Sequence, residues 1–167
     1  MKVMKKFGIY PGTFDPITYG HIDVIKKSLN IVDKLVVAVS NDYSRKYLFS
    51  VEERVSVIKN SLFKDLNFSK KKINVLNFNT LTTTLCKKLK TNIIIRGLRA
   101  VSDFEYEFQL AGMNRKLDKK IETVFLMSDV NNQIISSRLV KEIAKNKGKL
   151  KNFLTKSTIR AIMQKYD

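Results

Sequence analysis

The chain has 167 residues, of which 44 % are hydrophobic and 28 % are charged, values typical of one globular domain over residues 1–167. No apolar run reaches the ~18 residues that a membrane span needs, and the apolar stretch near the N-terminus is too short for a secretory signal. The only cysteine, Cys86, cannot form an internal disulfide. We therefore expect Cys86 to fill the core and the protein to be cytoplasmic.

The net charge of +17 is the unusual feature of the composition. Such a charge can indicate a nucleic acid, a membrane surface or a phosphorylated substrate as partner. The lysines, however, are spread along the whole chain, and the densest run is only Lys70-Lys71-Lys72. We interpret most of the charge as a lysine-rich surface, expect no nucleic-acid or membrane partner, and assign only a few basic residues to phosphates.

Short apolar runs and amphipathic stretches alternate along the chain. The apolar runs, most of them rich in β-branched residues, predict five strands: Phe7–Tyr10, Lys34–Val39, Ile73–Phe78, Asn92–Ile95 and Glu122–Met127. Residues at helical spacing predict inward helix faces made of Ile22, Ile25, Leu29 and Val32, of Val51, Val55, Ile58 and Leu62, and of Phe104, Phe108 and Ala111.

Capping residues mark two of these helix starts. Ser50 with Glu53, and Ser102 with Glu105, have the spacing of a capping box. Two more helices are expected, from about Ser137 to Lys145 and from about Thr155 to Tyr166. Together the elements predict an α/β fold, a single Rossmann-like domain whose five-stranded parallel sheet has helices on both faces.

The segments that follow the strands are the place to look for a ligand site, because ligands of such sheets bind outside the carboxyl ends of the strands. These segments are Pro11–His21, Asn41–Lys46, Asn79–Thr82, Arg96–Arg99 and Asn131–Arg138. Four of the five carry basic side chains, hydroxyls, glycines or a helix N-terminus, which are the groups that bind anions. The pattern predicts a phosphate site at this edge of the sheet.

The first of these segments carries the strongest signal. Gly12 and Gly20 allow tight turns and close approach to a ligand. His21 is the only histidine and stands at the predicted start of the first helix, where the helix dipole favours an anion. Thr18 can cap the same helix, and Thr13 lies at the turn that leaves the strand, although turn formation alone would also account for both threonines.

Other signatures of nucleotide or metal chemistry are missing from the sequence. There is no G-x-x-x-x-G-K-[ST] loop, no G-x-G-x-x-G fingerprint and no G-x-S-x-G elbow. One histidine and one cysteine cannot supply the spacing of a typical zinc site.

Several strings resemble those of one known family. Thr18-Tyr19-Gly20-His21 is similar to the (H/T)-x-G-H motif of the nucleotidylyltransferase superfamily, and Ile135-Ser136-Ser137-Arg138 is similar to its second motif. The longer strings Tyr10 to Pro16, Glu52-Glu53-Arg54, Arg96 to Glu107 and Val140-Lys141-Glu142 resemble the bacterial phosphopantetheine adenylyltransferases. The resemblance covers nearly the whole chain in order.

The resemblance implies adenylyl transfer from ATP to 4′-phosphopantetheine, which gives dephospho-coenzyme A and pyrophosphate with Mg²⁺ held mainly through the ATP phosphates. It also implies a homohexamer and inhibition by coenzyme A. The ATP-binding residues it implies are Thr13, Phe14, His21, Gly97, Leu98, Arg99, Glu107, Asn132, Gln133, Ile134, Ile135, Ser136, Ser137 and Arg138. Those implied for phosphopantetheine are Thr13, Arg45, Thr82 and Arg96.

Two positions depart from the family pattern. Arg45 stands where the family usually has lysine, and Arg138 stands where a third serine or threonine is common. Arginine keeps the positive charge at both positions but changes the geometry of the donors.

The residue types suit a reaction between two phosphates. The attacking phosphate is already ionised near pH 7, so no general base is required. Two unit charges 4 Å apart repel by about 4 kcal/mol at an effective dielectric constant of 20, and this repulsion is the obstacle to be overcome. We expect His21, Arg45 and Arg99 to be the catalytic residues that offset it, helped by Lys46 and Arg96.

Three other functions remain open at this point. A sister enzyme with the same two motifs would act on nicotinate mononucleotide or glycerol 3-phosphate, and the Arg96-Gly97-Leu98-Arg99 string argues against it. A nucleic-acid-binding module would need a continuous basic face with interleaved aromatic residues. An inactive homologue would not be expected to retain His21.

Overall fold

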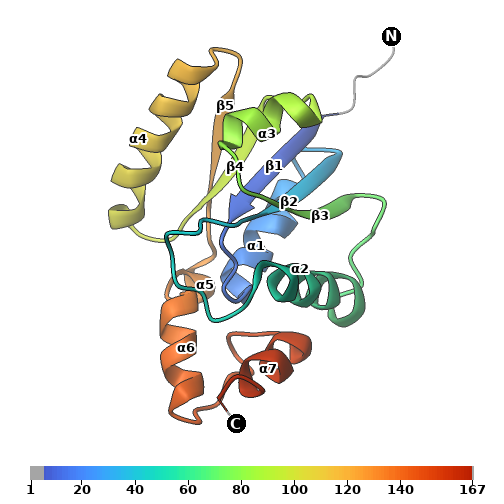
Figure 1. The fold of residues 1–167 in the computed structure, drawn as a ribbon, viewed down its shortest axis with the longest axis vertical. Coiled ribbons are helices and arrows are strands. Elements are labelled where there is room, and N and C mark those ends of the chain that lie inside the picture. Colours follow the sequence, from blue (N-terminus) through green and yellow to red (C-terminus); the bar gives the residue numbers. More distant parts are fainter. Residues whose placement is uncertain (1–5, 167) are drawn as a thin grey trace.

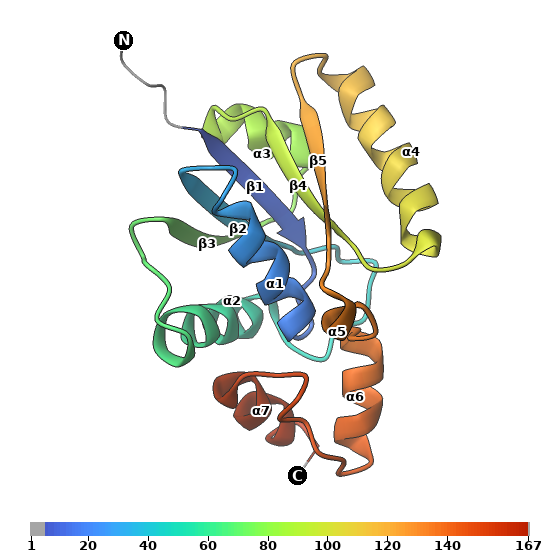
Figure 2. The same cartoon turned by 180° about the vertical axis from the view of Figure 1, so that it is seen from behind.

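A computed structural model describes residues 6–166, without the side chains of Val101 and Ser102. Its centre is one sheet in which five parallel strands follow the order β3-β2-β1-β4-β5 (Figures 1 and 2). The strands are β1 (Phe7–Gly12), β2 (Lys34–Ser40), β3 (Ile73–Phe78), β4 (Ile93–Leu98) and β5 (Glu122–Met127). The predicted α/β class and the five-stranded parallel sheet are confirmed.

Two strands run well past their predicted ends, and a third, β2, runs one residue past its predicted end, to Ser40. The predicted ends at Tyr10 and Ile95 are wrong, because β1 continues to Gly12 and β4 continues to Leu98. In both cases the backbone stays in register with the neighbouring strand, Gly12 opposite Val39 and Leu98 opposite Met127. Backbone pairing does not depend on an apolar side chain, so the sequence pattern ended the strands too early.

The helices cover both faces of the sheet and its carboxyl edge. They are α1 (Tyr19–Ser28), α2 (Val51–Lys59), the π-helical segment η1 (Asn60–Asp65), α3 (Thr82–Leu89), α4 (Val101–Leu117), α5 (Val130–Gln133), α6 (Ser137–Lys145) and α7 (Lys156–Met163). Helices α1 and α2 lie over one face and α3 over the other, while α6 and α7 lie beyond the carboxyl ends of the strands (Figures 1 and 2).

One of the two predicted capping boxes forms. The Ser50 backbone N–H donates to Glu53 Oε2 at 2.8 Å, and the Glu53 N–H donates to Ser50 Oγ at 3.1 Å. The other prediction is wrong, because α4 begins at Val101 with Ala100 at the N-cap; the Ser102 side chain lies outside the described residues.

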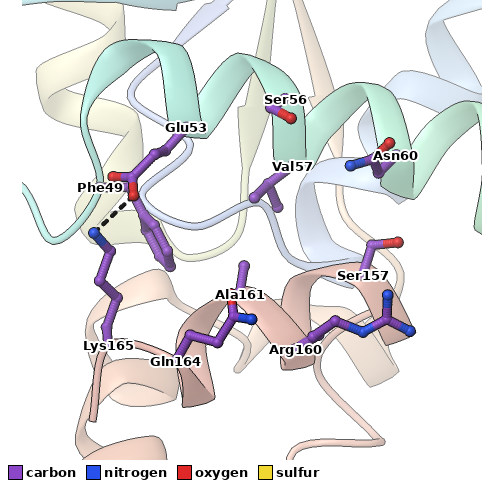
Figure 3. A pocket seen from close by; sticks show the side chains of 10 residues that line it. All are labelled: Phe49, Glu53, Ser56, Val57, Asn60, Ser157, Arg160, Ala161, Gln164 and Lys165. Atoms are coloured by element: carbon purple, nitrogen blue, oxygen red, sulfur yellow. Dashed lines mark ion pairs between the residues drawn. The ribbon is translucent and has the colours of Figure 1, made fainter. Parts of the chain in front are cut away.

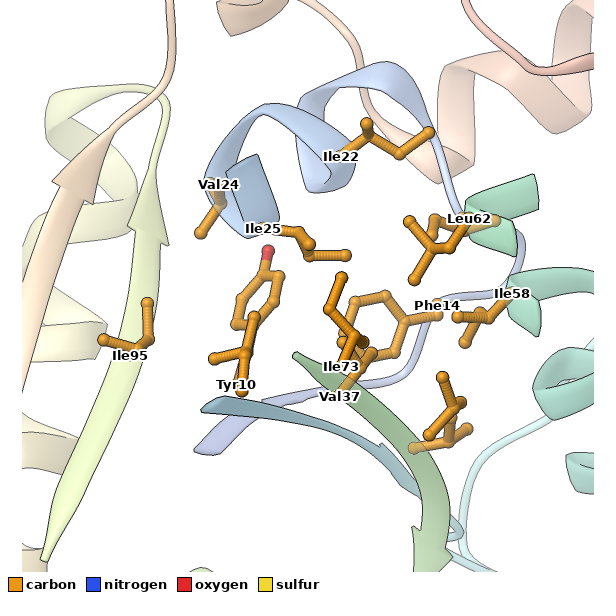
Figure 4. Packing of buried hydrophobic residues seen from close by; sticks show 14 of the residues in the cluster. Tyr10, Phe14, Ile22, Val24, Ile25, Val37, Ile58, Leu62, Ile73 and Ile95 are labelled. Carbon is orange, nitrogen blue, oxygen red and sulfur yellow. The ribbon is translucent and has the colours of Figure 1, made fainter. Parts of the chain in front are cut away.

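Alternating side chains of the strands build a core on each face of the sheet. On the α1 and α2 face, Tyr10 and Val37 pack with Phe14 and Ile25 in the larger cluster (Figure 4). On the α3 face a smaller cluster forms around Ile9, Ala38, Leu85, Cys86, Ile94 and Ile121. Cys86 is buried as predicted, and burial raises its thiol pKa to about 11, so it is a core residue and no nucleophile.

Helix α4 is the place where the predicted core is wrong. Phe104 is 44 % exposed and Phe108 is 63 % exposed, and Ala111 is only partly buried. The Phe104 ring reaches Phe125 of the edge strand β5 at a centroid distance of 6.2 Å, but Phe108 has no such cover on the sheet. Helical spacing of apolar residues shows that a helix has an apolar face, but it does not show what covers that face.

A groove separates α2 from α7 on the outside of the domain. It has a volume of about 390 Å³, and the Glu53–Lys165 ion pair, 2.7 Å long, crosses one end (Figure 3). None of the predicted site residues lines it. Within residues 6–166, no helix combines the length and apolar character that crossing a bilayer requires.

The close packing of α1 on β4 gives a test of the fold. A Cβ atom added at Gly97 would lie 2.7 Å from Val24 Cγ2 of α1, so Gly97→Ala should lower the free energy of unfolding by about 1–3 kcal/mol. Urea denaturation measures this change.

Gly112→Ala is the matched control, because nothing lies within 4 Å of its added Cβ on helix α4. Alanine is the better helix former by up to about 1 kcal/mol, so this variant should be as stable as the parent protein or more stable. Equal unfolding midpoints for Gly97→Ala and the parent would show that the α1–β4 contact is not tight.

Candidate active site

The sheet has its switch point between β1 and β4. The chain builds β1, β2 and β3 toward one edge and then returns to place β4 on the other side of β1. In open parallel sheets this is where the segments after two neighbouring strands diverge and leave a crevice for a ligand. The segment Thr13–Thr18 follows β1 and leads to His21, and Arg99 after β4 lies close enough to His21 to affect its pKa.

The segment after β1 has a tightly determined backbone. Phe14 has a φ of 49°, in the left-handed region that non-glycine residues rarely adopt. A Cβ added at Gly12 would lie 2.9 Å from the Phe14 ring, so only glycine leaves room for that ring. The ring in turn meets the His21 imidazole edge-on at a centroid distance of 5.1 Å. Phe14 is therefore a buried support beneath His21.

His21 occupies the first turn of α1 with its ring held by Thr18. The Thr18 backbone N–H donates to His21 Nδ1 at 3.1 Å, and the Thr18 Oγ1 lies 3.0 Å from the same nitrogen. Because Nδ1 accepts a hydrogen bond, the ring proton of the neutral imidazole resides on Nε2. Burial and the positive charge of Arg99 lower the pKa of His21 from 6.5 to about 4. At neutral pH the ring is an uncharged hydrogen-bond donor.

The N-terminus of α1 adds one backbone donor. The Tyr19 N–H donates to the Phe153 carbonyl at 2.9 Å, and the His21 N–H donates to the Thr18 side chain in a capping box, so the Gly20 N–H is the first-turn group left for an anion. A Cβ at Gly20 would lie 3.4 Å from the Asn132 carbonyl oxygen, so glycine allows the helix start to approach the segment after β5. This arrangement suits a bound anion.

Arg96 and Glu107 form a buried ion pair near this crevice. Arg96 Nε donates to Glu107 Oε2 at 2.6 Å, and Nη2 pairs with the other carboxylate oxygen. Arg96 Nη1 also donates to the Pro11 carbonyl at 2.8 Å, which joins β4 to β1. The Glu107 carboxylate raises the pKa of Arg96 against the effect of burial, so the arginine stays charged. Three of its five N–H donors are used by these contacts.

Arg99 brings the segments after β4 and β5 together. Its Nε donates to Asp103 Oδ2 at 3.1 Å, and its Nη1 donates to the Ile135 carbonyl at 3.4 Å. Its side chain is 39 % exposed, so part of the guanidinium is free to contact a ligand.

The predicted serines serve the backbone in this structure. Ser136 is the N-cap of α6 and accepts from the Leu139 N–H at 3.2 Å, and Ser137 Oγ donates to the Pro16 carbonyl at 2.8 Å. No helix was predicted before these serines, but Val130–Gln133 form the short helix α5. Gln133 Nε2 donates to the Ser128 carbonyl, Asn132 is partly buried, and Ile134 is exposed.

Three predicted site residues make other contacts than with His21, Arg96 or Arg99. Arg45 lies on an exposed loop after β2 and pairs with Asp42 at 3.2 Å. Thr82 is the first residue of α3. Arg138 is 88 % exposed and pairs with Glu142 at 3.3 Å. Within the described part of the chain, no hydrogen bond or ion pair joins these three residues to His21, Arg96 or Arg99.

A buried carboxylate that the sequence analysis assigned no role joins three parts of the site. Asp15, 4 % exposed, accepts from the backbone N–H groups of Leu48 and Phe49, each at 3.0 Å. It also pairs with Lys141 Nζ of α6 at 2.9 Å. Asp15 and Lys141 both lie in strings that carried the family resemblance, but sequence spacing alone does not bring them together.

Comparison with known proteins agrees with these features. A family model described as cytidylyltransferase-like matches residues 9–143. The chain is 65 % identical to a phosphopantetheine adenylyltransferase of Pelagibacter ubique, over 98 % of this chain and 100 % of that protein. It is 44 % identical to a phosphopantetheine adenylyltransferase of Sphingopyxis alaskensis, over 95 % and 92 % of the two chains.

Solved structures show the same fold in more distant proteins. The structure superposes on nicotinic acid mononucleotide adenylyltransferase of Plasmodium falciparum with a TM-score of 0.70, covering 96 % of each chain. The two sequences are 20 % identical, so this likeness concerns the fold alone.

The state of His21 is directly measurable, because the chain has no other histidine. With a pKa of about 4 in the folded protein, against 6.5 for an ordinary histidine, its ring signals in an NMR titration should stay constant from pH 8 down to about 5. A midpoint near 6.5 in the folded protein would contradict the partly buried, neutral ring.

The same shift affects stability. The unfolded chain binds a proton at His21 below about pH 6.5, whereas the folded chain binds it only near 4, so this histidine should lower stability as the pH falls between these values. His21→Gln should flatten that part of the stability profile.

Proposed function

The chain belongs to the phosphopantetheine adenylyltransferase family, and from this we propose that it transfers the adenylyl group of ATP to 4′-phosphopantetheine. The products are dephospho-coenzyme A and pyrophosphate, so the reaction is a step of coenzyme A synthesis. The observation that carries the proposal is the neutral His21 ring at the N-terminus of α1, next to the cation Arg99.

The reaction needs no general base in this proposal. An ionised phosphate oxygen of phosphopantetheine attacks the α-phosphorus of ATP in line, a new P–O bond forms, and the bond to the β-phosphate breaks. Pyrophosphate leaves with its electron pair. No proton has to be removed from the nucleophile, so the single titratable ring of the site serves another purpose.

That purpose is to stabilise negative charge on the α-phosphate. His21 Nε2–H and the Gly20 N–H in the first turn of α1 donate toward the same anion in this proposal. Because Thr18 fixes the ring through Nδ1, the donor needs no reorganisation during the reaction. Arg99 and Arg96 add positive charge, which offsets the repulsion between the two reacting phosphates.

We also propose the substrate assignments that the family resemblance implies. Thr13, Phe14, Gly97, Leu98, Arg99, Glu107 and residues 132–138 form the ATP side, and Thr13, Arg45, Thr82 and Arg96 form the phosphopantetheine side. Glu107 acts through its ion pair with Arg96, and Phe14 acts by supporting the His21 ring. Arg45 and Thr82 lie on segments that follow the neighbouring strands β2 and β3, and this common edge of the sheet supports placing them on the phosphopantetheine side.

Mg²⁺ belongs to the proposal as the ion that neutralises the triphosphate. Among the residues described, no three or more histidine, cysteine, aspartate or glutamate side chains are grouped to hold a metal. In the proposal the ion arrives with ATP and is held mainly by its phosphates. Cytoplasmic location and inhibition by coenzyme A are further parts of the proposal, and the buried Cys86 thiol suits a reducing compartment.

Assembly into a hexamer is supported by the surface of α4. Phe104, Tyr106, Phe108, Met113 and Leu117 of this helix are each between 44 % and 63 % exposed. They occupy more than one side of the helix, and a helix that is apolar on several sides is normally buried. We define these five residues as the α4 face. Contact between α4 faces of several copies would remove this area from water.

The activity itself is tested by pyrophosphate release from ATP and Mg²⁺, with and without 4′-phosphopantetheine. Release should depend on phosphopantetheine and not on nicotinate mononucleotide or glycerol 3-phosphate. Release with one of these two alternative acceptors instead would assign the chain to another substrate.

Removing the Nε2–H donor of His21 should abolish most of the catalytic rate. His21→Ala should lower kcat by about a hundredfold or more, equivalent to about 2.7 kcal/mol, with a much smaller change in ATP affinity. Thermal unfolding of the variant must show that it is folded, because the Phe14 ring also packs on His21. A near-normal kcat in the folded variant would remove His21 from the mechanism.

The assembly is tested at the centre of the α4 face. Phe108→Glu should shift the particle mass, measured by analytical ultracentrifugation, from the hexamer to smaller species. Ile31→Glu is the control, because Ile31 is an exposed apolar residue after α1 and lies outside the α4 face. A parent protein that sediments as a monomer, or equal masses for Phe108→Glu and the parent, would contradict this assembly.

A further inference from the structure

Arg54 of α2 is a charged residue buried in the interior of the protein. It is 1 % exposed, and it belongs to the Glu52-Glu53-Arg54 string, which showed a family resemblance but suggested no role. Among the described residues, it forms no ion pair with a carboxylate. A buried charge without a counter-charge is costly, so its retention needs a reason beyond packing.

The contacts of Arg54 show which parts of the chain it connects. Its Nη1 donates to the Thr13 carbonyl at 2.8 Å and to the Ser40 carbonyl at 2.9 Å. Its Nη2 donates to Asn41 Oδ1 at 3.4 Å. Thr13 follows β1, whereas Ser40 and Asn41 end β2 and begin the loop that carries Arg45. One guanidinium group therefore holds the backbones of two neighbouring strand ends.

The orientation of the guanidinium is fixed from the side. Its central carbon lies 4.0 Å from the centroid of the Tyr47 ring, a distance typical of a cation–π contact. The Tyr47 hydroxyl in turn accepts from the Asp42 N–H at 3.3 Å, within the same loop. The Nε atom is buried and has no partner, so the group is not positioned by Nε. The two carbonyls and the Tyr47 ring define its position.

We propose that Arg54 is a positioning residue that fixes the segment after β1 relative to the segment after β2. This inference rests on the proposed function, in which the first segment contacts both substrates and the second carries Arg45 for phosphopantetheine. The arginine would thus set the separation of the two substrates. Rates of reaction between two bound groups fall steeply when their alignment changes by even about 1 Å.

Lysine and glutamine at this position test the role. Arg54→Lys keeps the charge, but one ammonium group cannot reproduce the planar fork that spans two carbonyls and an amide. We expect kcat to fall by about tenfold or more, with the dissociation constant of each substrate measured alone changing by less than about threefold. Arg54→Gln, which also loses the charge, should be at least as slow. Arg160→Lys, on the exposed surface of α7, is the control.

The split between rate and binding distinguishes positioning from other roles. If Arg54 only stabilises the fold, the melting temperature falls while kcat, measured well below it, stays unchanged; that result would overturn the proposal. A loss confined to the affinity of one substrate would also overturn it, because Arg54 would then act at one subsite and not between two.

A second pair of variants keeps the test decisive if Arg54 variants do not fold. Tyr47→Leu removes the ring beneath the guanidinium, whereas Tyr47→Phe keeps the ring and removes only the hydroxyl. Tyr47→Leu should lower kcat in the same manner as Arg54→Lys but less strongly, and Tyr47→Phe should be closer to the parent. Equal rates for Tyr47→Leu and the parent would contradict the proposal.

Hydrogen exchange separates this inference from the proposed activity. In Arg54→Lys, peptides covering the segments after β1 and after β2 should both exchange faster, while peptides of α4 should not change. If Arg54→Lys does not fold, Tyr47→Leu replaces it in this measurement. This readout needs no substrate. It therefore tests the connection that Arg54 makes between the two segments even if no acceptor is adenylylated. Unchanged exchange in both segments of the folded variant would overturn the inference.

Discussion

The parallel arrangement of the five strands is the constraint on which the site depends. It brings every segment that follows a strand to the same edge of the sheet, and the return of the chain from β3 to β4 opens that edge beside β1. His21 and Arg99 are separated by many residues in sequence, but each follows one of the two central strands. Their meeting is therefore a consequence of strand order, before any side chain contributes.

The charge state of the site follows from that meeting. Burial of the ring, and after it the positive charge of Arg99, lowers the pKa of His21, so the ring remains neutral near pH 7. A neutral ring fixed through Nδ1 acts only as a donor through Nε2, whereas permanent positive charge is supplied by Arg96 and Arg99. One residue thus supplies an oriented hydrogen-bond donor, and other residues supply the positive charge.

Sequence patterns predicted the elements that depend on local information. The Ser50–Glu53 capping box and the bounds of β3, β5 and α6 follow from neighbouring residues alone, and they are confirmed. The exposure of Phe108 and the contacts of Asp15 and Arg54 were not predictable in this way. Each depends on what a distant segment does: whether it covers a helix face, or brings a carbonyl or N–H group to a buried side chain.

Several residues in the strings that resemble the family support the site without facing a ligand. Asp15, Arg54 and Ser137 use their polar atoms on backbone groups of other segments, and all three hold the segment after β1 or contact it. At the end of the same segment, Thr18 fixes the His21 ring through Nδ1, and the Gly20 N–H has no acceptor within the helix. Fixing the rest of the segment allows the His21 ring and the Gly20 N–H to point at an anion without further rearrangement.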